Sequence, residues 1–397
     1  MIRLEDKANC CGCSACSSVC PKQCITMKAD REGFMYPVID EDKCIDCGLC
    51  EKVCPCINRE KEEDSVKKSY VIRNNKKDIL MNSPSGGVFT SIAEEFLKDG
   101  AVIYGSGFDD DWVVRHFKAD TMEKAERFRG SKYVQSDVTG VFQEIKALLD
   151  DNVYVVFSGT PCQVDGLKNY LRKDYDNLFT VDVICHGVPS PLLWEKYRKY
   201  QEKKFGSKLK ESNFRNKTYG YHSGSMKLTF ENGKSYYGSA RVDYMLKPFF
   251  REISSRPSCY DCPSKKVGHS ADMSLYDCWN ADKLLGTACD DCGYTNVLVH
   301  TQKGLKVVEL LKKYCFVQEV DTKKAIALDG PMITKSAVPH KKRDQFYSTL
   351  QEKGIEKTIE ELIPISKKDY IIERVKRILH RLGIINLIRK LRDKMAK

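Results

Sequence analysis

Two stretches of the sequence carry the same cysteine motif: CCGCSACSSVCP at residues 10–21 and CIDCGLCEKVCP at residues 44–55. In each stretch three cysteines stand three residues apart, and a fourth follows directly before a proline. A short loop with this spacing turns three thiolates towards one centre, where its backbone N–H groups can also donate to sulfur. The repetition predicts two related metal-binding halves, joined by a turn and a short strand at residues 30–39.

The motif is typical of bacterial ferredoxins, in which the fourth cysteine of each run binds the cluster of the other run. The spacing therefore predicts two 4Fe-4S clusters, with these ligands: Cys10, Cys13, Cys16 and Cys54 for the first, and Cys44, Cys47, Cys50 and Cys20 for the second. The alternative is a pair of zinc sites, but zinc ribbons usually carry two CxxC pairs, rarely three thiolates within seven residues. Cys11, Cys24 and Cys56 fall outside the pattern and are expected to be small buried thiols without a ligand role.

Cysteine usage also bears on the compartment. Of nineteen cysteines, eleven lie at or before Cys56. The first residues form no apolar segment of the secretory kind, and no stretch approaches 18 uncharged apolar residues. We therefore expect a cytoplasmic protein, in which clustered cysteines bind metal more often than they form disulfides.

The chain of 397 residues is too long for a single small domain and predicts two or three. Composition shifts divide it into four segments: a double 4Fe-4S ferredoxin domain at 1–58, a charged linker at 59–68, a body at 69–365 and a basic tail at 366–397. The expected fold class is α+β, in which a small ferredoxin-like module precedes a larger α/β domain and a C-terminal amphipathic helix.

The body alternates strand and helix patterns. Apolar runs predict strands at 101–105, 153–157 and 179–184, and helical spacing predicts helices at 88–97 and 164–171. The loops that follow two of these strands carry Cys162 and Cys185, and ligands of α/β sheets bind at the carboxyl ends of strands. With the pair Cys259-x2-Cys262 these thiols could hold a third cluster, although isolated CxxC pairs are also zinc sites or plain turns.

Six motifs occur in order along the body: Ser85-Gly86-Gly87, Gly130-Ser131-Lys132-Tyr133-Val134-Gln135, Ser158-Gly159-Thr160-Pro161-Cys162-Gln163, Cys185-His186-Gly187, Phe214-Arg215-Asn216-Lys217 and Cys259-x2-Cys262. Together they resemble the coenzyme F420 hydrogenase/dehydrogenase beta-subunit family, in its bacterial type with an N-terminal double 4Fe-4S ferredoxin module. The resemblance spans about residues 5–335.

This resemblance implies an α/β flavoprotein domain that binds FAD beside a third 4Fe-4S cluster, whose ligands would be Cys162, Cys185, Cys259 and Cys262. It also implies which residues line the FAD site: Ser85, Gly86, Gly87, Ser131, Lys132, Gln135, Thr160 and Pro161. Lys132 would favour the anionic reduced flavin, unless it is an ordinary surface lysine. Glycines before a helix suit a phosphate, but they also form ordinary turns.

Other polar residues remain open to two interpretations. His186 is a proton-donor candidate, or a hydrogen-bonded structural residue. Arg215 and Lys217 either grip an anionic substrate or form a solvated charge pair. The sequence departs from the family at Tyr276, where a glycine is expected and a tyrosine would narrow the pocket. The extra cysteines Cys278, Cys289 and Cys292 are alternative ligands, a redox pair or chance.

Clusters carry single electrons and flavins also transfer hydride equivalents, so the combination predicts a converter between the two. The expected function is an oxidoreductase that passes electrons between ferredoxin-type clusters and FAD to reduce or oxidise an organic substrate or a deazaflavin-like coenzyme. Ferredoxin or another low-potential carrier would be the donor or acceptor. The alternative is an electron-transfer beta subunit that serves a partner hydrogenase, dehydrogenase or synthase. A zinc-stabilised nucleic-acid binder is a third, less suitable class.

The formal net charge of +11 is concentrated in the tail. Residues 367–397 contain eleven Lys or Arg and three Asp or Glu, which is a local charge of +8 and leaves +3 for the rest of the chain. Apolar residues Ile371, Val375, Ile378, Leu382 and Ile385 share one helical face of this segment. The pattern predicts a helix on an anionic membrane surface, on an acidic partner or on its own body, and no nucleic-acid partner.

Overall fold

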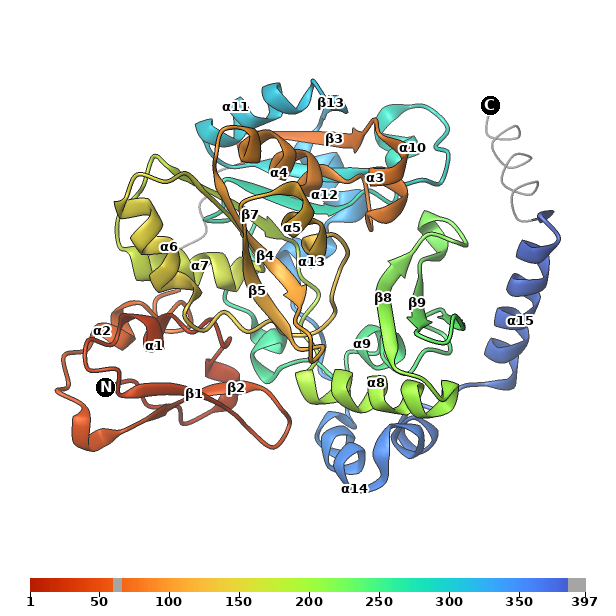
Figure 1. Cartoon of the computed structure of the whole chain (residues 1–397), viewed down its shortest axis with the longest axis horizontal. Coiled ribbons are helices and arrows are strands. Elements are labelled where there is room, and N and C mark those ends of the chain that lie inside the picture. The colour runs from red at the N-terminus through yellow and green to blue at the C-terminus, as the bar shows by residue number, and fades with distance from the viewer. Residues whose placement is uncertain (60–65, 385–397) are drawn as a thin grey trace.

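The computed structural model describes residues 1–59 and 66–384 (Figure 1). The first of these segments forms a ferredoxin-like module with four short elements: α1 (Ala15–Val19), β1 (Ile25–Ala29), β2 (Met35–Ile39) and α2 (Leu49–Lys52). Strands β1 and β2 pair antiparallel, with Ile25 opposite Ile39, so the strand expected between the cysteine runs is confirmed. Each helix begins inside one run, directly after Cys13 and Ser14 or after Cys47 and Gly48.

The body is built on one mixed sheet of eight strands. Its order is β13 (Cys315–Val320), β3 (Lys68–Asn74), β12 (Thr295–Val299), β11 (Met273–Asp277), β7 (Leu178–Val183), β6 (Val155–Gly159), β4 (Val102–Phe108) and β5 (Val114–Ala119). The four strands β11, β7, β6 and β4 run parallel, and antiparallel strands flank them on both sides. The strands expected at 101–105, 153–157 and 179–184 are therefore present, with ends displaced by a few residues.

Helices cover both faces of this sheet, as expected for parallel strands with continuous apolar runs. One face packs against α4 (Val88–Lys98) and α11 (Gln302–Leu311), and the other against α6 (Val141–Asp150) and α7 (Pro161–Leu171). Side chains alternate between the two cores: Val156 faces α4, whereas Val155 and Phe157 face α7. Short helices complete the body: α3 (Lys77–Asn82), α5 (Met122–Ala125), α10 (Ala281–Leu285), α12 (Thr322–Asp329) and α13 (Pro331–Thr334).

A second core surrounds a three-stranded antiparallel sheet, with the order β10 (Ser235–Gly238), β9 (Ser225–Phe230) and β8 (Leu209–Asn216). Around it lie α8 (Pro191–Phe205), α9 (Leu246–Phe250) and α14 (Arg343–Leu362), which is interrupted at Gly354. Phe34 and Tyr36 of the module are buried in this same core beside Trp194 and Tyr347. The module therefore shares an apolar core with the body.

The two charged segments differ in how much of them the structure describes. Most of the linker expected at 59–68 lies outside the described residues, as does the end of the basic tail that contains Ile385. The tail begins with α15 (Lys367–Arg381), which stands at the edge of the molecule beyond the three-stranded sheet (Figure 1). Within the described residues no helix is long and apolar enough to cross a membrane.

Tyr276, the departure from the family pattern, lies on β11 with only 7% of its surface exposed. Its ring packs with Leu298 and Ile333, and within the described residues its hydroxyl is buried without a hydrogen-bond partner. A buried hydroxyl without a partner costs free energy, whereas the ring contributes to packing. The tyrosine therefore fills a hydrophobic cluster under the sheet.

We predict that Tyr276→Phe leaves the free energy of unfolding unchanged or raises it, because no hydrogen bond is lost. Tyr276→Ala is expected to lower it by about 3–5 kcal/mol through the cavity left behind. Anaerobic denaturant unfolding of the two variants measures the difference. Equal losses in both variants would show that the hydroxyl, and not the ring, stabilises this cluster.

Candidate functional site

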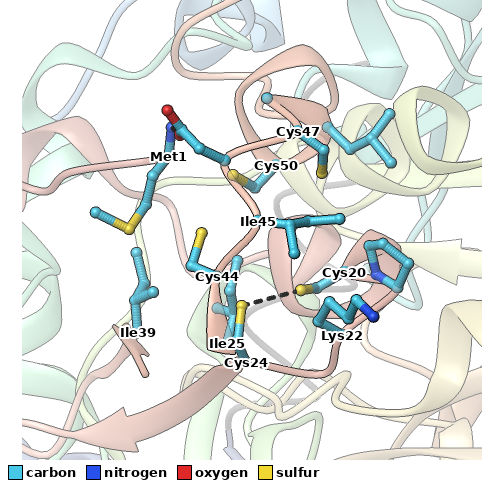
Figure 2. Close-up of a pocket in the computed structure, with 14 residues that line it drawn as sticks. Met1, Cys20, Lys22, Cys24, Ile25, Ile39, Cys44, Ile45, Cys47 and Cys50 are labelled. Atoms are coloured by element: carbon cyan, nitrogen blue, oxygen red, sulfur yellow. Dashed lines mark hydrogen bonds and ion pairs between the residues drawn. The ribbon is translucent and has the colours of Figure 1, made fainter. Parts of the chain in front are cut away.

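The cysteines predicted for the second cluster line one pocket of the module. Figure 2 shows the side chains of Cys20, Cys44, Cys47 and Cys50 around this pocket, together with Cys24. The pocket encloses about 360 Å³ of empty space, part of it open to solvent. The backbone N–H of Ile2 donates to Cys50 Sγ at 3.3 Å, and Cys20 Sγ lies 3.3 Å from Cys24 Sγ. Since Cys47 is exposed, this site lies at the solvent side of the module.

The cysteines predicted for the first cluster lie deeper, against the body. Burial, followed by the neighbouring Cys13 and Cys10 thiols, raises the pKa of Cys16. A hydrogen bond with Cys56, followed by burial, raises the pKa of Cys54, which also lies near Cys13. Cys13 packs in the same core as Val164 and Leu167 of α7. The exposed end of the module is thus at Cys47 of the second set, and the end buried against the body is at Cys13 of the first set.

Left-handed backbone shapes both cysteine loops at equivalent positions. Gly12 (φ 71°) and Ser14 (φ 62°) flank Cys13, and Asp46 (φ 46°) and Gly48 (φ 71°) flank Cys47. Left-handed residues beside ordinary ones turn successive N–H groups to the same side, which forms an anion-binding concavity of the kind found at iron-sulfur sites. Because a 4Fe-4S cluster with four thiolates is negatively charged, this backbone geometry fits it. The loops therefore supply N–H groups as well as thiolates.

The four cysteines predicted for a third cluster also come together. Cys162 lies in the first turn of α7 directly after β6, Cys185 follows the parallel neighbour β7, and Cys259 and Cys262 lie in or beside the turn at Pro257–Asp261. Burial, then the neighbouring Cys185, raises the pKa of Cys259 to about 12, with Cys162 a further contributor. Burial, then Cys162 and Cys259, raises the pKa of Cys262.

Short contacts surround these four thiols as well. The Gly187 N–H donates to Cys185 Sγ at 3.3 Å, and Thr160 Oγ1 lies 3.2 Å from Cys162 Sγ. Within residues 1–59 and 66–384 no group of three or more His, Cys, Asp or Glu could hold a metal ion. A cubane differs from a single ion, because each of its irons takes one thiolate and the four sulfurs stand around it. Cys162, Cys185, Cys259 and Cys262 therefore stay predicted ligands of a third cluster.

Cys11 and Cys56, expected to be thiols without a role, lie between the module and the body. Hydrogen bonds with the thiols of Cys13, Cys162 and Cys56, together with burial, raise the pKa of Cys11 well above its usual value. Cys11 therefore touches a residue of the first cysteine set and a residue of the third set. The positions of Cys11 and Cys56 in the sequence do not predict that they lie between the module and the body. The contact of Cys11 with Cys162 depends on how the module docks on the body.

Arg256 is the polar centre of the interface and has no exposed surface. Its guanidinium donates to the carbonyl oxygens of Cys10 (2.7 Å) and Met35 (3.0 Å) in the module. It also donates to Gln135 Oε1 in the body (2.9 Å) and stands 4.1 Å from the centre of the Tyr36 ring. Arg256 precedes Cys259 by three residues, so one buried cation lies between the first and third cysteine sets. Nothing in the sequence pattern marks this arginine for such a role.

The residues that the resemblance assigns to FAD lie along the carboxyl edge of the parallel strands. Ser85 Oγ is 2.9 Å from Thr295 Oγ1, beside the end of β11. A β-carbon on Gly86 would stand 2.4 Å from the Ile72 carbonyl oxygen, so only glycine lets this loop approach the sheet. Gly87 (φ 79°) then begins α4. Lys217 fixes the same loop by donating to the carbonyl oxygens of Ser85, Leu80 and Cys292.

Lys132 and the Thr160-Pro161 turn lie at the same edge. Lys132 Nζ donates to the carbonyl oxygens of Ser106 in β4 (2.9 Å) and Arg127 (2.8 Å), and burial followed by the Arg127 charge lowers its pKa to about 7. Ser131, next to it, is half-buried. Thr160 and Gln163 form a capping box at the start of α7, with Pro161 at the first turn.

The contacts of three further predicted residues, Gln135, Arg215 and His186, are as follows. Gln135 donates to the Cys11 carbonyl oxygen at 3.1 Å and accepts from Arg256, so it faces the module. Arg215 pairs with Asp277 at 2.5 Å and stacks over Trp279, and is therefore not a solvated charge. His186 is half-buried, with Nε2 3.2 Å from Glu252 and its other ring nitrogen against Met332. Burial, opposed by Glu252, lowers the pKa of His186.

The extra cysteines of the body lie away from these sets. Cys278 is buried after β11, in an apolar cluster that also includes Cys289. Burial and then Asp329 raise the pKa of Cys278. Cys292 lies in the loop that Lys217 holds.

The fold and the paired cysteine loops define an iron-sulfur protein with an α/β body. Residues 9–58 match the model of the 4Fe-4S dicluster domain, and residues 153–324 match the model of the C terminus of the coenzyme F420 hydrogenase/dehydrogenase beta subunit. Both matches agree with the resemblance that the sequence motifs indicated: residues 153–324 are similar to the C-terminal part of this beta subunit, and residues 9–58 to a 4Fe-4S dicluster module.

A curated protein and a solved structure are among the proteins that resemble the chain. The uncharacterized protein MJ1349 of Methanocaldococcus jannaschii is 25% identical over 236 residues, which are 57% of this chain and 58% of that protein. The chain thus spans less than two thirds of this relative. A chain of the F420-reducing NiFe hydrogenase complex of Methanosarcina barkeri aligns at a TM-score of 0.45 with 19% identity, over 76% of this chain and 95% of that one.

We predict that Cys262→Ala lowers the iron content of the anaerobically reconstituted chain from about twelve to about eight atoms, because one of three four-iron clusters is lost. The control is Cys315→Ala, which removes another buried thiol, on β13, far along the chain from all three sets. Iron analysis and the electron paramagnetic resonance signal of the reduced protein measure the result. An unchanged iron content in Cys262→Ala would contradict the assignment of the third cluster.

We predict that Arg256→Met lowers the free energy of unfolding by about 3–5 kcal/mol, because two carbonyl oxygens and the Gln135 amide lose their charged donor. It should also lower the reduction potentials of the neighbouring clusters, since a nearby cation stabilises the added electron. Potentiometric titration followed by electron paramagnetic resonance measures the second effect. Arg251→Met, which removes an exposed cation five residues earlier, is expected to leave both quantities unchanged.

Proposed function

We propose that this chain is an iron-sulfur flavoprotein that passes electrons between ferredoxin-type 4Fe-4S clusters and FAD, and so reduces or oxidises an organic substrate or a deazaflavin-like coenzyme. The observation that carries the proposal is the continuous buried contact from Cys13 through Cys11 to Cys162. It joins a cysteine of the module to a cysteine of the body, and Arg256 links the same two parts through the carbonyl oxygen of Cys10 and the amide of Gln135. A module docked in this way suits electron transfer within one chain.

The exposure of the cysteines supports an order along the module. Cys47 is exposed beside a pocket that is partly open to solvent, whereas Cys13 is buried in the core that the module shares with α7 of the body. We therefore propose that ferredoxin or another low-potential carrier docks at the Cys47 end. When bound, clusters carry single electrons and a flavin exchanges these for hydride equivalents. The residues of this chain would hold these groups, with Cys11 buried between the first and third cysteine sets.

For the flavin we propose a site at the carboxyl edge of β11, β7, β6 and β4. The residues proposed to line it are Ser85, Gly86, Gly87, Ser131, Lys132, Thr160 and Pro161. Gly130 supports an opening beside Ser131, because no heavy atom lies within 4 Å of where its β-carbon would stand. Gln135 is left out of this set, since both ends of its amide already bind the interface.

His186 is proposed to handle a proton for the reaction. It directly follows Cys185 at the end of β7, and its imidazole is half-buried beside Glu252. Burial favours the neutral ring, which can accept a proton that Glu252 then stabilises. Its edge lies against Phe249, which restricts the orientation of the ring.

A second proposal is that the chain serves a partner enzyme as its electron-transfer subunit. The family takes its name from a beta subunit of hydrogenases and dehydrogenases, and such a subunit acts beside others. The two proposals differ in one measurement. A chain that oxidises a reduced viologen with a small acceptor on its own is an enzyme, whereas a chain that stays reduced until a partner is added is a subunit.

We predict that the anaerobically reconstituted chain retains FAD, and that Lys132→Met lowers the reduction potential of this flavin because the protonated amine favours the anionic reduced form. Since burial lowers the pKa of Lys132 to about 7, the shift is expected below that pH and should fade above it. Spectroelectrochemical titration of the bound flavin measures the shift. Lys118→Met, which removes an exposed lysine from the neighbouring strand β5, is the matched control and should leave the potential unchanged. A colourless preparation that contains stoichiometric zinc and no flavin would refute the proposed function.

A further inference from the structure

Helix α15 contacts the body with its polar side. Glu373 is 2% exposed and accepts hydrogen bonds from the N–H (3.3 Å) and hydroxyl (2.7 Å) of Ser239. Lys376 donates to Ser225 Oγ at 3.2 Å and lies 4.3 Å from the centre of the Tyr219 ring. Further contacts come from Arg377, which donates to the Tyr237 carbonyl oxygen, and from Asp369, which pairs with Arg241. These positions share one face at helical spacing.

The apolar residues of α15 lie on the opposite face and are exposed. The exposed fractions are 62% for Ile371, 46% for Val375, 47% for Ile378 and 65% for Leu382. Their spacing of four, three and four residues places them in one stripe along the helix. Residue 373, the buried contact, lies about half a turn away from this stripe. The helix is therefore inverted relative to an ordinary surface helix, which buries its apolar stripe.

An exposed apolar stripe of this length calls for a cover, since soluble surfaces rarely keep contiguous bulky aliphatic side chains in water. The body of the same chain cannot supply this cover, because Glu373 and Lys376 already occupy the side that faces it. Exposed cations border the stripe at both ends and along its margins: Lys367, Lys368, Arg374 and Arg381. An apolar stripe with cationic margins complements the acyl boundary and headgroups of an anionic bilayer.

We propose that α15 docks this protein on an anionic phospholipid surface, with the stripe of Ile371, Val375, Ile378 and Leu382 inserted below the headgroups. The polar face of α15 would then remain on the three-stranded sheet. The body is thus held at the membrane while the contacts between α15 and the sheet stay intact. This surface is independent of the proposed redox function and does not rely on any cofactor. The proposed partner of the basic tail is therefore a negatively charged lipid.

The test uses the full chain and sedimentation with phosphatidylcholine vesicles, prepared with and without phosphatidylglycerol. Binding is expected only with phosphatidylglycerol, and it should weaken as salt is added because the cations are screened. Val375→Asp combined with Ile378→Asp should reduce binding at least about tenfold, since two inserted side chains become charged. The control pair Val338→Asp and Phe316→Asp adds the same charge at exposed apolar residues elsewhere and should bind as the unmodified chain does.

Circular dichroism and iron content establish that both double variants are folded. The proposal is overturned if the full chain stays in the supernatant with both kinds of vesicle, or if the α15 variant binds as well as the control pair. It is also overturned if analytical ultracentrifugation shows a dimer that the α15 variant alone loses, because a second copy would then cover the stripe. Loss of vesicle binding confined to the α15 variant supports it.

Discussion

The burial of one positive charge organises the contact between the two parts of this protein. Removing a guanidinium from water is costly unless every donor finds an acceptor, and Arg256 finds its acceptors on two carbonyl oxygens of the module and one amide of the body. A second buried pair, Arg343 with Glu32, joins α14 to the turn between the cysteine runs at 2.6 Å. Since both ion contacts need the module and body together, neither part can satisfy its buried charges alone. The cysteine sets on either side are consequently held at fixed separation.

The two cysteine runs of the module could be predicted from the sequence because their spacing follows a local rule, whereas the third set was predicted from a family resemblance. Three thiolates within seven residues need no knowledge of the fold, and Cys162 and Cys185 follow apolar runs that form neighbouring parallel strands. Contacts made by docking were not accessible in this way. Nothing near Cys11 indicates that it meets a residue 151 positions later, and Gln135 was assigned to the flavin because its amide could not be known to face Arg256. The roles of Cys11 and Gln135 depend on partners that are far away in the sequence.

The tail shows the same limit in another form. Helical periodicity separates an apolar face from a polar one, but it does not state which face meets the body. Here three particular contacts, made by Glu373, Lys376 and Arg377, fix the orientation, and their partners in or directly after the strands of the small sheet lie more than 130 positions earlier. An amphipathic sequence pattern therefore determines which side chains share a face of the helix, but not which face contacts the body. The face that contacts the body is determined by the hydrogen bonds of α15 with residues of the three-stranded sheet and the loop after it.

The left-handed turns of the two cysteine loops bear on how this module diversified. At the first turn one half has glycine and the other Asp46, and at the second turn the first half has Ser14 and the other glycine. Each half has therefore kept its glycine at a different place while both retain the same backbone path. The two halves share the same left-handed backbone conformation at both turns. Each half adopts it with one glycine and one strained non-glycine residue. A search for related modules that demands glycine at either position would overlook one half of this one.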